Sequence, residues 1–265
     1  MNIIVTGSGG FIGKHLCSYL KHEHSVIGIG SKQIDLRESN RVKDAFRNFK
    51  NIDAVIHLAA RLSTANDMSI LYDNIKITEN LADSIKLFKP RKVINISSIA
   101  VYPNKEGIYK ETSEIDPSFN TESSYGISKF CSEQIFNSYL KNEPIVISHL
   151  RLAQVYGEGM REDRLISIML KELREKNTIT VFGNGKRLSN FINIDKLNKI
   201  ISVFIEKDYP GVYNVGEENL SYLKLAERLI KKYGKKESKI IKMASGSKAK
   251  FFLDTSKLRK ILAYA

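Results

Sequence analysis

A glycine-rich turn close to the N-terminus limits what this chain can fold into. Asn2–Val5 is a short apolar run, typical of a buried parallel strand. Three glycines at three-residue spacing follow it, and a helix is predicted from Lys14 to about Lys21. This arrangement allows a tight turn, close approach of the backbone to a pyrophosphate, and phosphate binding at the helix N-terminus. The sequence therefore predicts a dinucleotide site with contacts at Gly7, Gly10, Phe11, Ile12 and Gly13.

Strands and helices alternate along most of the chain. Apolar runs predict strands at 25–29, 54–60, 92–96, 144–151, 178–182 and 212–216. Amphipathic segments between them predict helices, and 107–121 is expected to be a loop. The pattern favours an α/β fold, a doubly wound (Rossmann-like) parallel sheet with a smaller interleaved C-terminal substrate lobe. We place the dinucleotide-binding domain at 1–153 and 188–215 and the substrate lobe at 154–187 and 216–265.

Composition excludes several classes of function. No apolar run approaches the roughly 20 residues of a membrane span, and the chain enters a strand directly from Met1, so we expect a cytoplasmic protein without membrane contact. Cys17 and Cys131 are expected to be small buried hydrophobes in a reducing compartment, and no metal-ligand spacing occurs. The net charge is +13, but the positive residues are spread out, apart from a cluster at 231–250 that has little aromatic interleaving. We therefore expect an anionic small substrate and no nucleic acid.

The segment after the second predicted strand bears on the choice of cofactor. An acidic residue here would bind the adenosine ribose 2′-hydroxyl, but the sequence offers Gly30, Ser31 and Lys32. A hydroxyl and an ammonium group suit a 2′-phosphate, so we expect NADP(H), with NAD(H) as the alternative if Lys32 is only a solvated loop residue. Asp35, followed by Leu36, could bind the adenine amino group or simply start a turn.

The predicted strand at 54–60 ends in small residues, which would let the backbone approach the cofactor at Leu58, Ala59 and Ala60. His57 lies at the same strand end. A structural histidine is the better interpretation there, although a catalytic role is the alternative.

A tyrosine and a lysine lie four residues apart in a predicted helix. At this spacing Tyr125 and Lys129 share one helical face, and an ammonium group beside a phenol lowers the pKa of the phenol. Ser97 and Ser98 follow the strand at 92–96, at the sheet edge where ligands bind in open α/β folds. The hydroxyl, the phenol and the amine form a plausible catalytic set. The alternative is a core aromatic residue and a solvated lysine.

Taken in order, these motifs resemble the extended short-chain dehydrogenase/reductases, in particular their nucleotide-sugar epimerase, dehydratase and reductase branch. The glycine turn, His57–Ala60, Ser97–Tyr102, Tyr125–Lys129 and Arg151–Gly157 carry the resemblance. It implies that Ser98 hydrogen-bonds the substrate oxygen, that Tyr125 transfers the proton, and that Lys129 holds the nicotinamide ribose and lowers the Tyr125 pKa. It also implies hydride transfer to a sugar carbon, and a homodimer formed through the Tyr–Lys helix.

Several positions depart from the family pattern. Dehydratases of this branch carry an Asp-Glu pair where this chain has Ile99 and Ala100, which argues against dehydration. Gln154 replaces the family asparagine, and Ser189 replaces an arginine of the substrate loop. Lys186 and Arg187, which lie just before Ser189, are the candidates for binding the substrate diphosphate. The predicted substrate-binding residues are Arg61, Ser98, Ile99, Gln154, Lys186 and Arg187.

The missing acidic residue after the second strand fits a cofactor that is consumed and replaced. Our first hypothesis is therefore NADPH-dependent reduction of a 4-keto (deoxy) nucleotide sugar. The alternative is an NAD-dependent 4-epimerase, or a 3/5-epimerase, that retains its cofactor. Two further hypotheses, a non-catalytic dinucleotide-binding protein and a nucleic-acid binder, account for fewer of the motifs. The expected partner is a nucleotide-diphosphate sugar.

Overall fold

A six-stranded parallel sheet forms the centre of the molecule. The computed structural model describes residues 1–62, 67–120 and 122–263. The strands lie in the order β10-β6-β4-β3-β1-β2, and all neighbours are parallel. Their bounds are Asn2–Thr6 (β1), Ser25–Ile29 (β2), Ala54–His57 (β3), Lys92–Ser98 (β4), Val146–Leu152 (β6) and Gly211–Val215 (β10).

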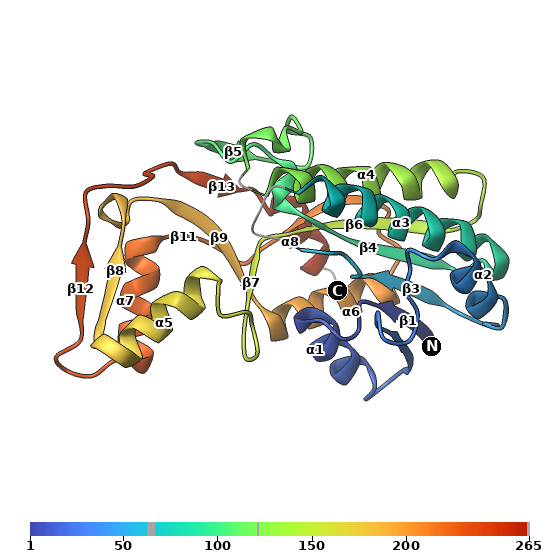
Figure 1. The fold of residues 1–265 in the computed structure, drawn as a ribbon, viewed down its shortest axis with the longest axis horizontal. Coiled ribbons are helices and arrows are strands. Elements are labelled where there is room, and N and C mark those ends of the chain that lie inside the picture. Colours follow the sequence, from blue (N-terminus) through green and yellow to red (C-terminus); the bar gives the residue numbers. More distant parts are fainter. Residues whose placement is uncertain (63–66, 121, 264–265) are drawn as a thin grey trace.

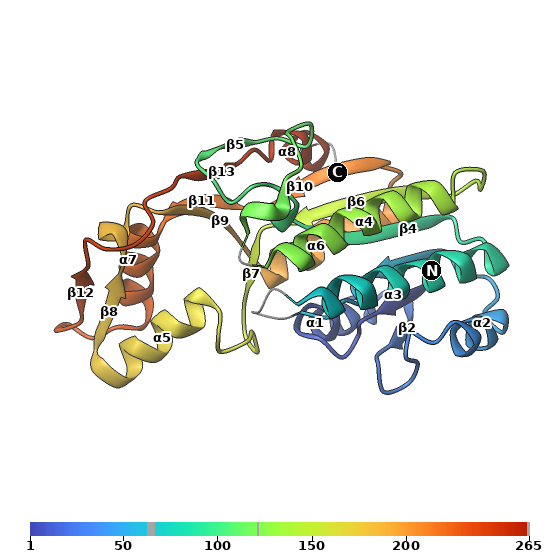
Figure 2. The ribbon, with the colours of Figure 1, turned by 45° about the horizontal axis from the view of Figure 1, so that its top comes forward.

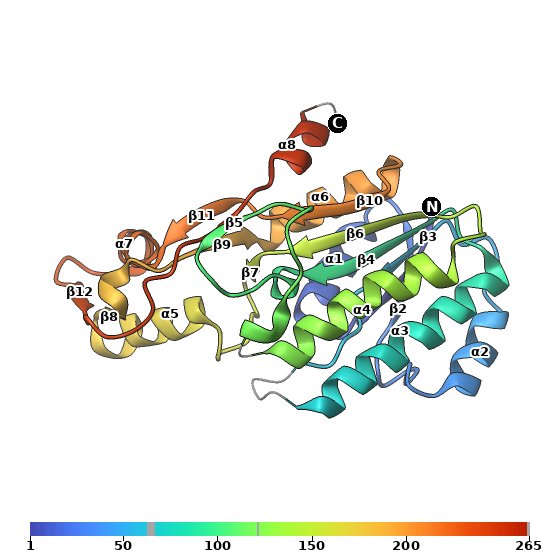
Figure 3. The same cartoon turned by 90° about the horizontal axis from the view of Figure 1, so that it is seen from above.

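Helices cover both faces of this sheet, as Figures 1 and 3 show. One face carries α1 (Phe11–Leu20) and α6 (Ile194–Glu206), and the other carries α2 (Ser39–Arg47), α3 (Met68–Phe88) and α4 (Ser123–Tyr139). Alternate residues of β1 enter separate cores: Ile3 and Val5 pack on the α6 side, and Ile4 packs on the α3 side. A strand buried on both faces needs a continuous apolar run, which explains the sequence of β1. The predicted doubly wound α/β fold is confirmed.

The order in which strands are added to the sheet reverses between β1 and β3. The chain runs from β1 to β2 on one side and then crosses to β3 on the other. Ligands of doubly wound sheets bind at such a switch point, beyond the carboxyl ends of the strands. The glycine turn between β1 and α1 lies at this point.

The C-terminal half adds a smaller lobe at one end of the sheet (Figure 2). Its core packs α5 (Leu165–Lys176) and α7 (Tyr222–Tyr233) against short strands. One sheet joins β7 (Gln154–Tyr156), β9 (Leu188–Asn193) and β11 (Glu218–Ser221), and another joins β8 (Thr178–Val181) and β12 (Lys239–Lys242). The domain division at 1–153 with 188–215 stays a prediction.

One connection differs from expectation. Much of the segment predicted as a loop at 107–121 is structured: β5 (Gly107–Tyr109) pairs with β13 (Phe251–Leu253), and Pro117–Phe119 forms a 3₁₀ turn. Position 121 lies outside the described residues. The chain ends in α8 (Ser256–Leu262) against β10. In the described part of the chain, no helix has both the length and the apolar character needed to cross a membrane.

The sequence offers Phe130, Ile135, Phe136 and Tyr139 of α4 either as a dimer contact or as part of the core, and most of them are internal. Phe136 is fully buried, and Phe130 and Ile135 pack against the core clusters, while Tyr139 is exposed. The homodimer stays a prediction.

Candidate active site

A cleft of about 1500 Å³ opens at the carboxyl edge of the sheet, between the glycine turn, α4 and the lobe. All but one of the predicted site residues line it. The exception is Lys186, which is exposed and is not part of the wall, and its role in substrate binding stays a prediction. The predicted residues that line the cleft are Gly7, Gly10, Phe11, Ile12, Gly13, Ser31, Lys32, Asp35, Leu36, Leu58, Ala59, Ala60, Arg61, Ser98, Ile99, Tyr125, Lys129, Gln154 and Arg187.

The glycine turn fits a pyrophosphate group. Gly7 has a positive φ of 72°, and a Cβ atom there would lie 2.7 Å from the amide nitrogen of Ala59. A Cβ atom at Gly13 would lie 2.2 Å from the carbonyl oxygen of Gly7, so only glycine allows the helix to start this close to the turn. The first turn of α1 has neither a side-chain cap nor an acidic residue. Its N-terminus is therefore available to an anion.

The end of the cleft beside β2 is more highly charged than the sequence suggested. Ser31 and Lys32 are exposed at its rim. Asp35 accepts hydrogen bonds from the backbone and the guanidinium of Arg37, which lower the pKa of its carboxyl group to about 2. Asp35 thus starts a turn, as one of the two interpretations expected, and it also lines the cleft. Arg37 also forms a salt bridge with Asp73, and Asp73 forms a second salt bridge with Arg61.

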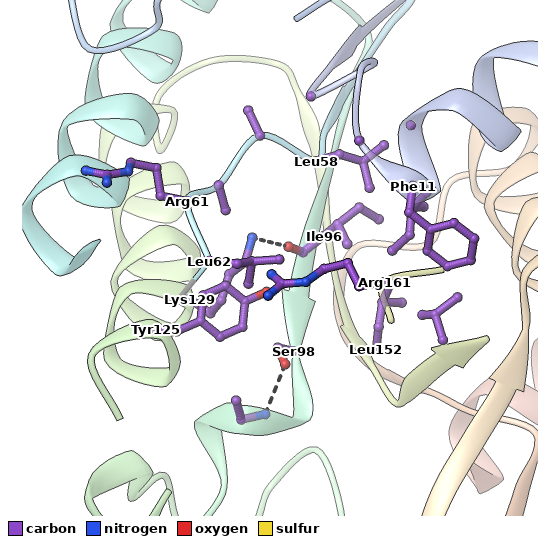
Figure 4. A pocket seen from close by; sticks show the side chains of 18 of the residues that line it. Phe11, Leu58, Arg61, Leu62, Ile96, Ser98, Tyr125, Lys129, Leu152 and Arg161 are labelled. Carbon is purple, nitrogen blue, oxygen red and sulfur yellow. Dashed lines mark hydrogen bonds between the residues drawn. The ribbon is translucent and has the colours of Figure 1, made fainter. Parts of the chain in front are cut away.

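Ser98, Tyr125 and Lys129 meet in the middle of the cleft (Figure 4). The Ser98 Oγ atom accepts a hydrogen bond of 3.1 Å from the Ala100 amide, and the Ser98 hydroxyl also hydrogen-bonds the Tyr125 phenol. The Lys129 Nζ atom donates to the carbonyl oxygen of Ile96 at 2.8 Å and lies 5.7 Å from the centre of the Tyr125 ring. Strand β4 and helix α4 together place the three predicted catalytic side chains.

The protonation of the pair differs from expectation. Burial raises the pKa of Tyr125 above its ordinary value, and the Glu122 charge adds to this, while Arg164 and Ser98 act in the opposite direction. Lys129 is not among these influences. Burial lowers the pKa of Lys129 to about 8, opposed by the charge of Glu133. The ammonium group of Lys129 is directed at a backbone carbonyl and contributes no shift to the pKa of Tyr125 here, so the lowering of that pKa by Lys129 stays a prediction.

His57 lies behind the cleft and is not part of its wall. Its ring is buried between Thr6 and Thr78, with Nδ1 2.9 Å from the Thr6 hydroxyl. Burial lowers the pKa of His57 to about 3. A neutral ring in this position fits the structural interpretation.

The lobe side of the cleft carries cations that the sequence did not single out. Arg161 and Arg164, on the loop before α5, line the cleft together with Arg187. Arg161 pairs with Asp163, and Arg164 pairs with Glu122 at 3.3 Å. The loop of residues 157–164 is short and strongly charged and directly follows the strand that carries Gln154. This placement is the signal that could have identified both arginines.

Gln154 and Ser189 form the neutral part of this wall. The Gln154 Nε2 atom donates a hydrogen bond of 2.9 Å to the Ser189 Oγ atom, between neighbouring strands β7 and β9. Both side chains line the cleft.

Comparison with known proteins agrees with this geometry. The model of the NAD dependent epimerase/dehydratase family matches residues 3–216. The chain belongs to this family. The expected relationship to the nucleotide-sugar epimerases and dehydratases is thereby confirmed, and the chain is an enzyme of this NAD-dependent family.

Relatives within the family match along the whole chain. An uncharacterized UDP-glucose epimerase of Bacillus subtilis, YtcB, is 27% identical over 296 aligned positions, covering 100% of this chain and 92% of the relative. A UDP-glucuronate 4-epimerase of Thermodesulfobacterium geofontis is 26% identical, covering 98% and 89%. The structure of UDP-glucuronic acid 4-epimerase of Bacillus cereus in complex with UDP-glucuronic acid and NAD is 30% identical, with a TM-score of 0.80 and coverage of 100% and 94%.

Proposed function

We propose that this protein is a nucleotide-sugar 4-epimerase that keeps NAD(H) in the cleft through the reaction. The observation that carries the proposal is the full-length match, at 30% identity, to an epimerase bound to NAD and a UDP-sugar. The cleft supports it, because the glycine turn and the Ser98–Tyr125–Lys129 set open into one continuous space.

The side chains divide the chemistry among them. When bound, a nicotinamide cofactor would supply the hydride chemistry, in which a hydride leaves the sugar carbon and is returned to its other face. Tyr125 takes the hydroxyl proton of the substrate and gives it back. Ser98 donates its hydroxyl proton to the same oxygen and orients it. Lys129 lies where an ammonium group can hold the cofactor ribose and stabilise the phenolate form of Tyr125.

Dehydration is a poorer interpretation of the same cleft. Ile99 and Ala100 follow Ser98 in a 3₁₀ turn, and neither side chain can exchange a proton. Epimerisation needs a single acid/base group on one oxygen, and the three predicted catalytic residues provide it.

The substrate diphosphate is assigned to the arginines of the lobe. Arg187, Arg161 and Arg164 line the cleft. Guanidinium groups bind phosphate oxygens through two parallel hydrogen bonds. The substrate would then lie with its sugar at Tyr125 and its nucleotide toward the lobe.

One observation favours a second function, the NADPH-dependent 4-ketoreductase. Gly30, Ser31 and Lys32 present no carboxylate to the adenosine ribose, and Lys32 is exposed at the rim of the cleft. A reductase exchanges its cofactor in each turnover, and an open 2′-phosphate site suits that exchange. The full-length relatives favour the epimerase.

A single assay separates the two. The purified protein is incubated with UDP-hexoses, UDP-hexuronic acids and 4-keto nucleotide sugars, with Tyr125→Phe as control. The epimerase interconverts two C4 epimers without added cofactor, leaves the nicotinamide absorbance unchanged, and releases NAD(H) on denaturation. Loss of NADPH absorbance with a 4-keto sugar, and no epimer exchange, would establish the reductase instead.

A further inference from the structure

Helix α4 is joined to β4 by buried polar contacts rather than by apolar packing alone. Three consecutive β4 residues each bond one α4 side chain, in the pairs Asn95–Ser132 at 2.9 Å, Ile96–Lys129 at 2.8 Å and Ser97–Glu133 at 2.6 Å. All of the α4 partners are buried. The contacts fix the rotation and register of the helix that carries Tyr125.

Glu133 is the charged centre of this seam. Arg151 of β6 binds its carboxylate through two hydrogen bonds, Nε to Oε1 at 2.9 Å and Nη2 to Oε2 at 2.7 Å, and Ser97 donates a third. The two charged side chains are 1% and 4% exposed. A buried ion pair is often no more stabilising than apolar residues of the same volume. We therefore looked for a role of the Glu133–Arg151 pair besides stability.

Such a role involves Lys129, the buried cation one helical turn before Glu133. It is buried, its ammonium group bonds a neutral carbonyl, and none of the salt bridges among the described residues includes it. The groups near it include Tyr125 on its own helix and the neutral His57 on β3. Glu133, one helical turn along α4, supplies the opposing charge.

We propose that Glu133, anchored by Arg151 and Ser97, is a positioning residue that serves as the buried counter-ion of Lys129. The proposal rests on the proposed function only in taking Lys129 as part of the catalytic set. Without the carboxylate, burial acts unopposed and Lys129 loses its proton at a lower pH. A neutral amine neither stabilises a phenolate nor attracts the oxygens of a ribose with full charge. Glu133 thus extends the pH range in which the site can work.

The test measures the titration of Lys129 directly. Lysine labelled with ¹³C at Cε is followed by NMR from pH 6 to 10, with Lys129→Arg assigning the signal. The variant Glu133→Gln/Arg151→Met removes both charges while keeping the volume. We expect the titration midpoint of Lys129 to fall by roughly one pH unit, the order expected when an opposite charge one helical turn away is lost at an effective dielectric constant of about 20 and the loss of Arg151 partly offsets it.

The matched control is Glu218→Gln/Arg228→Met, which removes an exposed pair of the same types from the lobe. It should leave the midpoint unchanged. Glu133→Asp retains the charge but withdraws it by one methylene, so a smaller fall in the same direction is expected if the double variant does not fold. An unchanged midpoint in either folded Glu133 variant overturns the proposal. A shifted midpoint in a protein without epimerase activity would instead reject the proposed function and retain this one.

Discussion

Gln154 and Ser189 are hydrogen-bonded to each other across β7 and β9, with Nε2 donating to Oγ at 2.9 Å. The two positions stand 35 residues apart in the sequence and both depart from the family pattern. Their contact shows that the two departures form one feature. It is an uncharged wall in place of the arginine that the family resemblance implies. The cations of this part of the cleft lie elsewhere, at Arg161, Arg164 and Arg187.

The first prediction concerns this pair. Gln154→Ala and Ser189→Ala each remove one partner, and the double variant removes both. Because a neutral hydrogen bond contributes about 1 kcal/mol, we expect the double-mutant cycle in substrate affinity or unfolding free energy to give a coupling of about 0.5–1.5 kcal/mol. Strictly additive effects would mean that the two side chains act independently.

Tyr125→Phe tests the proton transfer. The change removes only the hydroxyl group, so we expect turnover to fall by about 10²–10⁴ while NAD(H) affinity and the melting temperature stay close to those of the wild type. Isothermal calorimetry with NAD(H) and an epimerisation assay give the two values. Turnover at the wild-type rate would remove Tyr125 from the mechanism.

Arg187→Ala and Lys186→Ala form a matched pair of neighbouring cations. Arg187 lines the cleft, whereas Lys186 is exposed outside it. Loss of a charged hydrogen bond costs about 1.5–3 kcal/mol, so Arg187→Ala should raise KM for the nucleotide sugar by roughly tenfold or more. Lys186→Ala should leave KM unchanged. Equal effects of the two changes would contradict the assignment of the diphosphate to Arg187.

Lys32→Ala examines the choice of cofactor. Lys32 lies at the rim beside the expected adenosine ribose, so its loss should weaken NADP(H) binding more than NAD(H) binding. Fluorescence titration with both cofactors measures the ratio, and Lys50→Ala, which removes an exposed lysine after α2, is the control. A fall of equal size for both cofactors would show that Lys32 does not contact a 2′-phosphate.

The central sheet was predictable because its strands are continuous apolar runs between helices. The short strands were harder. β12 consists of two isoleucines between two lysines and is largely exposed, so its sequence carries little periodic signal. β5 pairs with β13, more than 140 residues further along the chain, and no local pattern indicates such a partner.

The site also combines features that have a local sequence signal with features that have none. The strand end and the four-residue spacing predicted that a serine, Tyr125 and Lys129 lie together at the sheet edge, and the resemblance selected Ser98 over Ser97. The pKa values did not follow from spacing, because they depend on burial and on Glu122, Arg164 and Glu133. The polar seam of α4 was also invisible, because a buried serine or glutamate looks like a solvated one until its partners on β4 and β6 are known.

The last prediction concerns acid stability. The buried ring of His149 accepts from the Asn95 amide at Nδ1 and donates from Nε2 to Asn137, an assignment that follows from the hydrogen-bond network and requires the neutral form. Burial lowers the pKa of His149 to about 4, compared with about 6.5 in an unfolded chain. Between these values the unfolded state binds more protons, so the stability is complete above about pH 6.5 and is lost as the pH falls toward 4.

His149→Gln removes this titration while keeping a donor and an acceptor. Urea unfolding between pH 4.5 and 7 should give a slope of unfolding free energy against pH that is smaller than in the wild type by up to about 1.4 kcal/mol per unit. His22→Gln, at an exposed position, should keep the wild-type slope. If His149→Gln also keeps the wild-type slope, the ring must take up its proton as readily in the folded protein as in the unfolded chain. The buried contacts between α4 and β6 would then have to accommodate a charge. The slope thus reports the protonation of the same buried layer that contains Glu133 and Arg151.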